Sequence, residues 1–219
     1  MSPELAISEY CERIDGSFWA EPANAVSNIA FLATAVGVWW LLPRGAPRDF
    51  PALLLIGLTV CTAIGSFLFH TMPSATTAIF DVLPIGLLIY ASFFIALMRF
   101  LKQSLLAAIW LTAGFLVFSI AISFGLRNVL GTSAGYVPAL VALYGVGIVA
   151  LPRNRRIGEG MIMTALMFTL SLVLRTMDGP VCGWFPIGTH FMWHVLNAVV
   201  IYMLLRLIVH ARQPKRQEY

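Results

Sequence analysis

The chain has 219 residues, of which 59% are hydrophobic and only 11% are charged, and its formal net charge is +4. Soluble proteins carry charge on about a quarter of their residues, and disordered chains are poor in apolar residues, so both classes are excluded. A membrane-spanning helix needs about 20 apolar residues, and this length therefore accommodates about seven spans with short connections. The composition predicts an integral membrane protein that acts in or at the bilayer.

Seven apolar stretches follow one another along the chain, separated by polar breaks or by breaks that contain proline or glycine. They cover residues 24–42, 52–70, 78–98, 104–124, 133–151, 158–177 and 187–209. Their residues do not alternate strictly in polarity, so we predict an all-α bundle of seven transmembrane helices rather than a β-barrel. In this single domain of residues 1–219, an acidic segment (1–23) precedes the helices (24–209) and a basic tail (210–219) follows them. The acidic N-terminal stretch does not predict a cleaved signal peptide.

The basic residues indicate how the bundle is oriented. When alternate loops are assigned to one side, that side collects 11 of the 14 basic residues and leaves Arg13, Arg127 and Arg175 on the other. The positive-inside rule then places the N-terminus outside and the C-terminus in the cytoplasm. Because the same rule accounts for the basic tail, we expect no nucleic-acid partner.

Three of the four histidines lie within or at the ends of predicted spans, where ionisable side chains are costly and commonly functional. His190 and His194 are four residues apart and therefore share one face of the seventh span. His70 ends the second span on the same outer side. Three imidazoles at one depth suit zinc and leave a tetrahedral position open. An HxxxH pair alone more often packs at a helix end, so the prediction depends on the third histidine and its neighbours.

Two polar residues accompany the histidines. Ser66 precedes His70 by one helical turn, and Asp81 lies at the outer end of the third span. An aspartate inside a membrane needs a partner, which a histidine N–H or a water on the metal would provide, so Asp81 is a candidate general base. Ser66 is a candidate donor to a developing oxyanion. A serine that bonds a carbonyl of its own helix is an equally good interpretation.

The acidic N-terminal segment is a second candidate site. Four carboxylates lie within thirteen residues, next to the outer mouth of the helices that carry the histidines: Glu9, Glu12, Asp15 and Glu21. Such oxygen ligands suit calcium, although their spacing is not that of an EF-hand. A solvated acidic surface is the better interpretation from composition alone.

The cysteines divide between the outer side and the membrane. Cys11 and Cys182 lie on the predicted outer side, whereas Cys61 lies within the second span and is expected to be free. An oxidising compartment permits a disulfide between the two outer cysteines, and such a bond would hold the acidic segment over the mouth of the site. Two separate free thiols are the alternative if the outer side is reducing.

Taken together, these stretches resemble the alkaline ceramidase family, within the superfamily of seven-helix membrane hydrolases that also contains the progestin and adiponectin receptors. The resemblance covers the whole chain. The motifs shared with the superfamily are SFLFH with Ser66 and His70, then Asp81, then HFMWH with His190 and His194. The motifs shared with the ceramidases are CE at Cys11 and Glu12, followed by the E-x-x-N-x-x-S-N pattern at Glu21, Asn24, Ser27 and Asn28.

This resemblance implies roles for individual residues. His70, His190 and His194 correspond to zinc ligands, and Ser66 and Asp81 complete a catalytic site on the non-cytoplasmic side. It also implies a calcium site, and only the resemblance favours calcium over a solvated arm. The residues that correspond to the calcium ligands are Glu9, Tyr10 through its backbone carbonyl, Glu12, Asp15 and Glu21.

The predicted function is hydrolysis of the amide bond of ceramide-type lipids to a sphingoid base and a fatty acid by a zinc-dependent intramembrane amidase. The expected partners are the lipid substrate and the bilayer, with no obligate protein partner. The alternative is a membrane lipid receptor or transporter with a structural metal site. A retinal-binding protein is excluded, because Lys102 and Lys215 are the two lysines and neither lies within a span.

Overall fold

The computed structural model of the chain describes residues 10–45 and 47–212, so part of the acidic segment and most of the basic tail lie outside it. The described residues form helices and no strand. The elements in chain order are α1 (Pro22–Ser27), α2 (Ile29–Leu41), α3 (Phe50–Thr71), α4 (Ala75–Arg99), α5 (Leu105–Leu130), the short 3-10 helix η2 (Gly131–Tyr136), α6 (Val137–Ala150), α7 (Arg155–Val181) and α8 (His190–Arg212).

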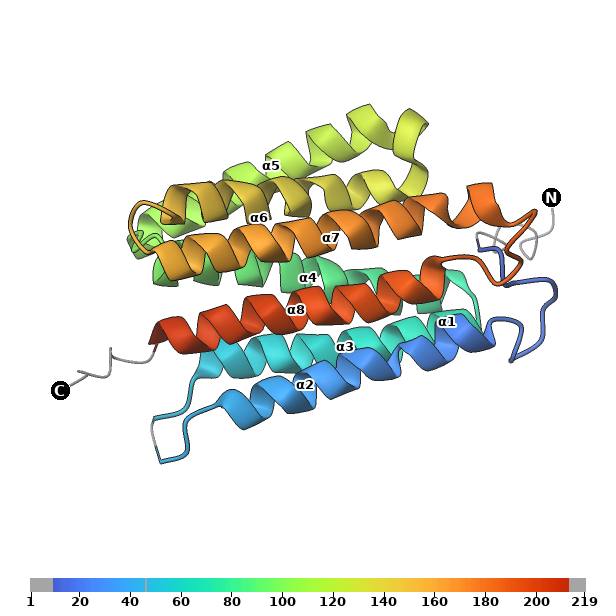
Figure 1. Cartoon of the computed structure of the whole chain (residues 1–219), viewed down its shortest axis with the longest axis horizontal. Helices are drawn as coiled ribbons and strands as arrows, with labels where there is room; N and C mark the ends of the chain where they lie inside the picture. The colour runs from blue at the N-terminus through green and yellow to red at the C-terminus, as the bar shows by residue number, and fades with distance from the viewer. Residues whose placement is uncertain (1–9, 46, 213–219) are drawn as a thin grey trace.

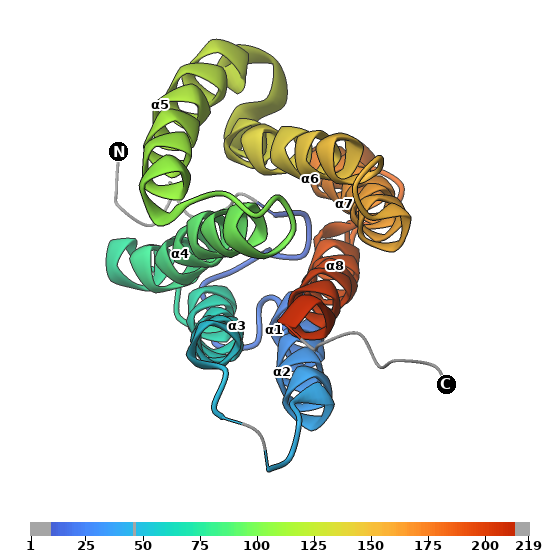
Figure 2. The same ribbon diagram turned by 90° about the vertical axis from the view of Figure 1, so that its left-hand side faces the viewer.

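The long helices run along one common direction (Figure 1), and end-on they form a single bundle (Figure 2). The buried core lies between α2, α3, α4, α6, α7 and α8, whereas α5 buries only Ala108, Phe115 and Ser119. Large apolar side chains such as Trp110, Phe124 and Val129 cover the outer faces. Apolar outer faces of this extent are typical of a bundle that faces lipid.

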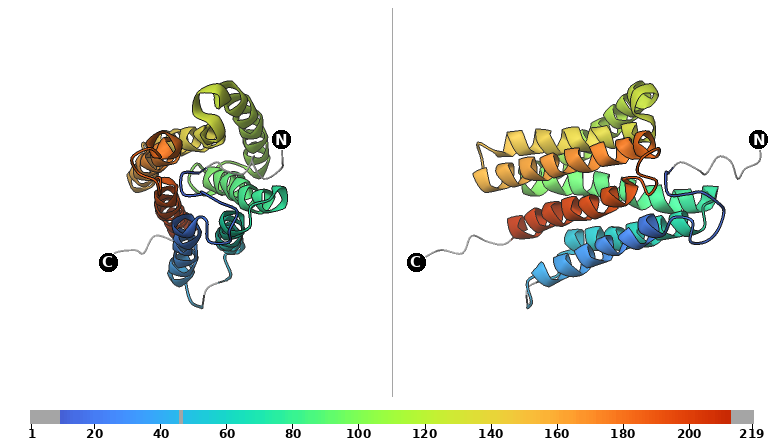
Figure 3. Two further views of the ribbon diagram at one scale, coloured as in Figure 1. Left: turned by 90° about the vertical axis from the view of Figure 1, so that its right-hand side faces the viewer. Right: turned by 45° about the vertical axis from the view of Figure 1, so that its right-hand side comes forward.

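Six helical stretches of the described chain are long and apolar enough to cross a membrane, which confirms a multi-pass, all-α membrane protein. The predicted number of seven is not established. Residues 105–150 count as one stretch of 46 residues, in which η2 joins α5 to α6. The reason is that α6 has only 14 residues, fewer than a bilayer normally requires. Figure 3 nevertheless shows α5 and α6 as two rods that meet at η2.

The end of the bundle away from the histidines is joined by a partly buried ion pair. The carboxylate of Asp49 begins α3 by accepting the N–H of Ala52 at 3.2 Å, and it pairs with Arg99 at the end of α4. Arg99 also donates to the carbonyl of Ile208 in α8 at 2.8 Å. Burial raises the pKa of the Asp49 carboxyl, but the hydrogen bonds from Arg99 and Ala52 outweigh burial and lower it.

We expect Asp49→Asn to destabilise the folded protein by about 2 kcal/mol at neutral pH, because it leaves the half-buried Arg99 without its counter-charge. The pKa of Asp49 is lower in the folded than in the unfolded chain, so this stabilisation is present above the unfolded pKa of about 3.9 and is lost as pH falls through the folded value. Melting temperatures of both proteins, measured from neutral to acidic pH, should therefore converge at low pH.

The control is Glu159→Gln, which removes an exposed ion pair with Arg155. Exposed pairs contribute little to stability, so this variant should melt like the wild type. Equal losses in the two variants would contradict a special role for Asp49.

Candidate metal centre

His70 of α3 and His190 and His194 of α8 meet inside the bundle. One ligand nitrogen from each lies within 4.8 Å of the others, and all three residues are buried. Among the described residues, this is the only group of three or more histidine, cysteine or acidic side chains that could hold a metal ion. The structure thus brings together the three histidines that helix periodicity and depth in the membrane predicted to converge.

The surroundings of His70 fit a metal ligand. Its Nδ1 lies 2.5 Å from Oε2 of Glu21, and an ionised carboxylate only accepts hydrogen bonds. The proton is therefore on Nδ1, and Nε2 carries the free lone pair. Nε2 is buried and has no hydrogen-bond partner among the described residues. A carboxylate that orients a histidine in this way is the usual outer partner in metal centres.

Residues of α1 hold the imidazole of His194 in the same tautomer as that of His70. Its Nδ1 lies 3.1 Å from the backbone carbonyl of Asn24 and 2.7 Å from the hydroxyl of Ser27. Because the Ser27 hydroxyl itself donates to that carbonyl, both oxygens accept from His194, and the proton is on Nδ1. His190 differs, since its Nδ1 faces a guanidinium nitrogen of Arg175 at 3.3 Å. Its imidazole stacks on the ring of Tyr10 at a centroid distance of 3.9 Å.

Ser66 and Asp81 lie in the same region, as predicted from their positions in the spans. Both line a cavity of about 910 Å³ together with His190 and His194. The backbone of Phe80 and Asp81 packs against Gly65, the neighbour of Ser66, and Oδ1 of Asp81 is buried without a hydrogen-bond partner among the described residues. This carboxylate is therefore available to a ligand in the cavity.

A glycine makes this arrangement possible. Any side chain at Gly65 would collide with the backbone carbonyl of Phe80, which immediately precedes Asp81. The absence of a Cβ thus lets α3 and α4 approach closely enough to bring Asp81 next to Ser66.

The carboxylates of the N-terminal segment have separate partners in the described structure. Glu12 accepts the backbone N–H groups of Ala23 and Asn24 at 2.7 and 2.8 Å, and so caps α1. Asp15 is exposed and accepts the N–H of Ser17 at 2.8 Å. Glu9 lies outside the described residues. These side chains are not gathered into a group of metal ligands among the described residues, and calcium binding stays a prediction.

The sequence predicts for Arg13 only a charge that marks topology, but the structure places it beside His70. Its Nε donates to Oε1 of Glu21, and another nitrogen donates to the carbonyl of His70 at 2.8 Å. Burial would raise the pKa of Glu21, but hydrogen bonds from His70, Asn24 and Arg13 lower it, so the carboxylate is ionised. The one signal in the sequence was a lone basic residue within an acidic run.

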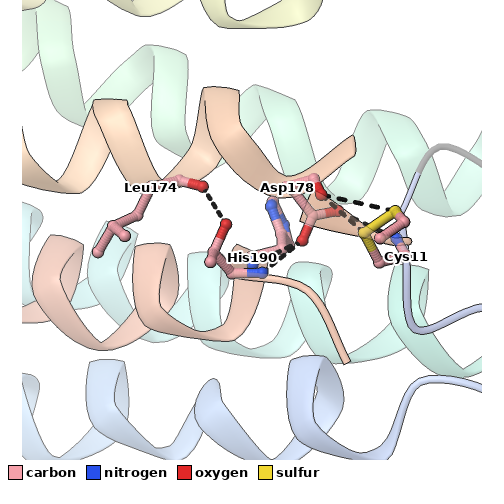
Figure 4. Close-up of a disulfide and its surroundings, with 6 residues drawn as sticks. Cys11, Leu174, Asp178 and His190 are labelled. Atoms are coloured by element: carbon pink, nitrogen blue, oxygen red, sulfur yellow. Dashed lines mark hydrogen bonds between the residues drawn. A yellow bond between two sulfur atoms is a disulfide. The ribbon is translucent and has the colours of Figure 1, made fainter. Parts of the chain in front are cut away.

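The N-terminal segment is attached to the end of α7 by a disulfide and by Asp178, which also bonds the start of α8 (Figure 4). Cys11 and Cys182 form the disulfide. One oxygen of Asp178 accepts the N–H of Cys11 at 3.0 Å, and the other accepts those of Thr189 and His190 at 2.7 and 2.9 Å. Asp178 therefore caps α8 at the residue that begins the histidine pair. The sequence reasoning missed it, because the residue follows the predicted sixth span and looked like part of a loop.

Gly188 completes this junction. Its φ of +70° is a backbone conformation that favours glycine, and a Cβ there would collide with Asp178 and Cys11. The tight turn before α8 therefore depends on this residue.

The fold and the site together define the class of protein to which the chain belongs. The protein is a multi-pass membrane protein in which two members of a buried three-histidine group, together with the carboxylate of Asp81, line a cavity between apolar helices. A protein-family model described as Ceramidase matches residues 3–219, which is nearly the whole chain. The chain belongs to the ceramidase family, and the resemblance seen in its sequence is confirmed. Membership places it among hydrolases of amide bonds. No curated protein and no solved structure matches the chain.

Proposed function

We propose that this protein is a zinc-dependent intramembrane amidase that hydrolyses ceramide-type lipids to a sphingoid base and a fatty acid. The observation that carries the proposal is the buried Nε2 of His70, which belongs to the three-histidine group and has no hydrogen-bond partner in the described part of the chain. Three neutral imidazoles are the ligands of catalytic zinc sites, which keep a further position open. The amide-bond chemistry is supported by the family.

Four polar side chains at or near the cavity have separate roles in this reaction. When bound, zinc supplies Lewis acidity and lowers the pKa of a water to about 7. The unpaired oxygen of Asp81 accepts the proton of the attacking water. The hydroxyl of Ser66 donates to the oxygen of the amide carbonyl as negative charge develops there. Glu21 and Ser27 hold His70 and His194 in the tautomers that present their Nε2 atoms.

The lining of the cavity supports this substrate class. Apolar side chains such as Phe31, Phe69 and Ile89 line its walls, and His190 and His194 line the same cavity. A long acyl chain and a long-chain base suit such walls, with the amide beside the histidines. The chain acts as one membrane domain, without an obligate protein partner.

We propose seven crossing helices, with the site on the non-cytoplasmic side and the C-terminus in the cytoplasm. The described basic residues between the helices support this orientation, because Arg44, Arg99 and Arg155 lie in or beside connections at the end opposite the histidines. The disulfide at the histidine end fits an oxidising compartment.

A lipid receptor or transporter with a structural metal is the rival function. Structural zinc sites are closed by four protein ligands. Here two of the three grouped histidines, His190 and His194, line a cavity that Asp81 also lines, which favours catalysis.

The test is to incubate the purified, zinc-loaded protein with ceramide in mixed micelles and to measure released sphingoid base by mass spectrometry. We expect release that stops on chelation and returns with zinc. The control is His210→Ala, which changes a histidine at the far end of α8 and should leave release unchanged. A zinc-loaded protein that releases no sphingoid base would refute the proposed function.

Calcium is a second proposed cofactor, supported by the family resemblance. A calcium ion that binds the folded protein must raise its stability by mass action. We expect calcium, but not magnesium, to raise the melting temperature of chelator-treated protein. Asp15→Asn should remove the effect, because it deletes one predicted ligand charge and keeps the bond to Ser17. If calcium does not change the melting temperature, the guanidinium of Arg13 is the cation that balances Glu21.

A further inference from the structure

Arg175 is a charged side chain of the cavity that the proposed chemistry does not use. It projects from α7 and lines the cavity beside His190. Its guanidinium lies 3.3 Å from Nδ1 of His190 and donates to the hydroxyl of Thr132 at 3.1 Å, while its Nε is buried without a hydrogen-bond partner among the described residues. No carboxylate of the described chain forms an ion pair with it. An arginine between membrane helices is costly without a counter-charge, which makes it a candidate binding group.

Aromatic rings hold this guanidinium in place. It lies over the ring of Tyr136 at 5.1 Å and over that of Trp193 at 5.4 Å, both measured to the ring centroid. Cation–π contacts of this kind stabilise a positive charge without neutralising it. Arg175 is therefore a fixed positive charge with donors left over, at the same end of the cavity as the histidines.

The shape of the guanidinium selects the ligand. Its planar fork of N–H groups matches a carboxylate, which it binds through two parallel hydrogen bonds. The apolar walls of the same cavity accept a long hydrocarbon chain. A positive charge at this place repels an ammonium group and so disfavours the amine of a sphingoid base.

We propose that Arg175 and Thr132 form a carboxylate subsite that binds the head group of a long-chain fatty acid beside the histidines. The inference deepens the proposed function, since amide hydrolysis of a ceramide produces this carboxylate. It places the acyl part of the substrate on the Arg175 side of the site and the sphingoid base away from it. Free fatty acids then compete with the substrate for the cavity.

The first experiment compares three ligands that share one chain and differ in the charge of the head group. Oleate, oleyl alcohol and oleylamine compete with tritiated oleate for the chelator-treated protein in detergent, at an alkaline pH where oleate is ionised. Chelation removes any contribution of a metal to carboxylate binding. We expect oleate to bind about 10- to 100-fold more tightly than the alcohol, as for one charge-assisted contact, and the amine to bind most weakly. Equal binding of the three ligands by the wild type overturns the proposal.

The second experiment assigns the preference to one residue. Arg175→Gln should bind oleate no better than the alcohol, whereas Arg175→Lys should keep part of the preference. The matched control is Arg127→Gln, because Arg127 also lines the cavity but is exposed. An Arg175→Gln variant with the wild-type preference overturns the proposal. If the melting temperature shows that this variant does not fold, Thr132→Val is measured in its place. Thr132→Val should then reduce the preference for oleate over the alcohol, and equal binding of the three ligands by the wild type still overturns the proposal.

Ceramide hydrolysis by the zinc-loaded protein, measured separately, distinguishes the two proposals. A protein that prefers oleate but leaves ceramide intact refutes the proposed function and keeps the carboxylate subsite. A protein that hydrolyses ceramide without preferring oleate refutes the subsite alone.

Discussion

Asp81→Asn is expected to reduce ceramide hydrolysis about 1000-fold, within the range known for the loss of a general base, while the fold and the bound metal are retained. Asparagine keeps the shape of the side chain but does not accept a proton from water. Oδ1 of Asp81 has no hydrogen-bond partner among the described residues, so the substitution breaks little that holds the bundle together. The measurements are turnover, metal content and melting temperature of the same preparations.

The turnover of Ser66→Ala is to be compared with that of Asp81→Asn. The loss of one oxyanion donor reduces turnover by about 100-fold, less than the loss of the base. An Asp81→Asn variant with wild-type turnover would mean that the carboxylate is structural. A variant that loses its metal as well as its activity would mean that Asp81 helps to hold the metal.

Removal of any one of the three histidines is expected to abolish stoichiometric metal binding. A three-ligand site that loses a ligand retains too few donors to hold zinc through purification. Elemental analysis of His70→Ala, His190→Ala and His194→Ala measures this directly, and His210→Ala is the control with an intact group. Metal contents that stay undiminished in all three variants would disprove the site.

Glu21→Gln tests the carboxylate that bonds Nδ1 of the metal ligand His70. It removes the charge that fixes the tautomer of His70 but leaves all three ligands, so metal affinity should fall by about 10- to 100-fold rather than disappear. Competition with a chelator measures that affinity in both proteins. An unchanged affinity would show that Arg13 and Glu21 only attach the N-terminal segment to α3.

Local patterns predicted much of the fold and the centre of the site. Apolar runs of about 20 residues identify membrane helices because each span satisfies its own backbone hydrogen bonds. Helical spacing predicted that His190 and His194 share a face, and the order of the spans placed His70 at the same depth. The seven-helix count was less secure, since α6 is short and joined to α5 through η2.

The sequence by itself thus determined the class, the family and the three histidines, while only the tertiary structure decided how these histidines are held. Glu21 reaches His70 across 49 residues, and Asn24 reaches His194 across 170. Such contacts depend on the path of the N-terminal segment over the bundle, which no local periodicity encodes. Arg175 looked like a charge that marks topology until the fold placed it in the cavity. The reason is that a side chain's partners inside a bundle are set by the packing of whole helices, whereas its place on one helix follows from the chain alone.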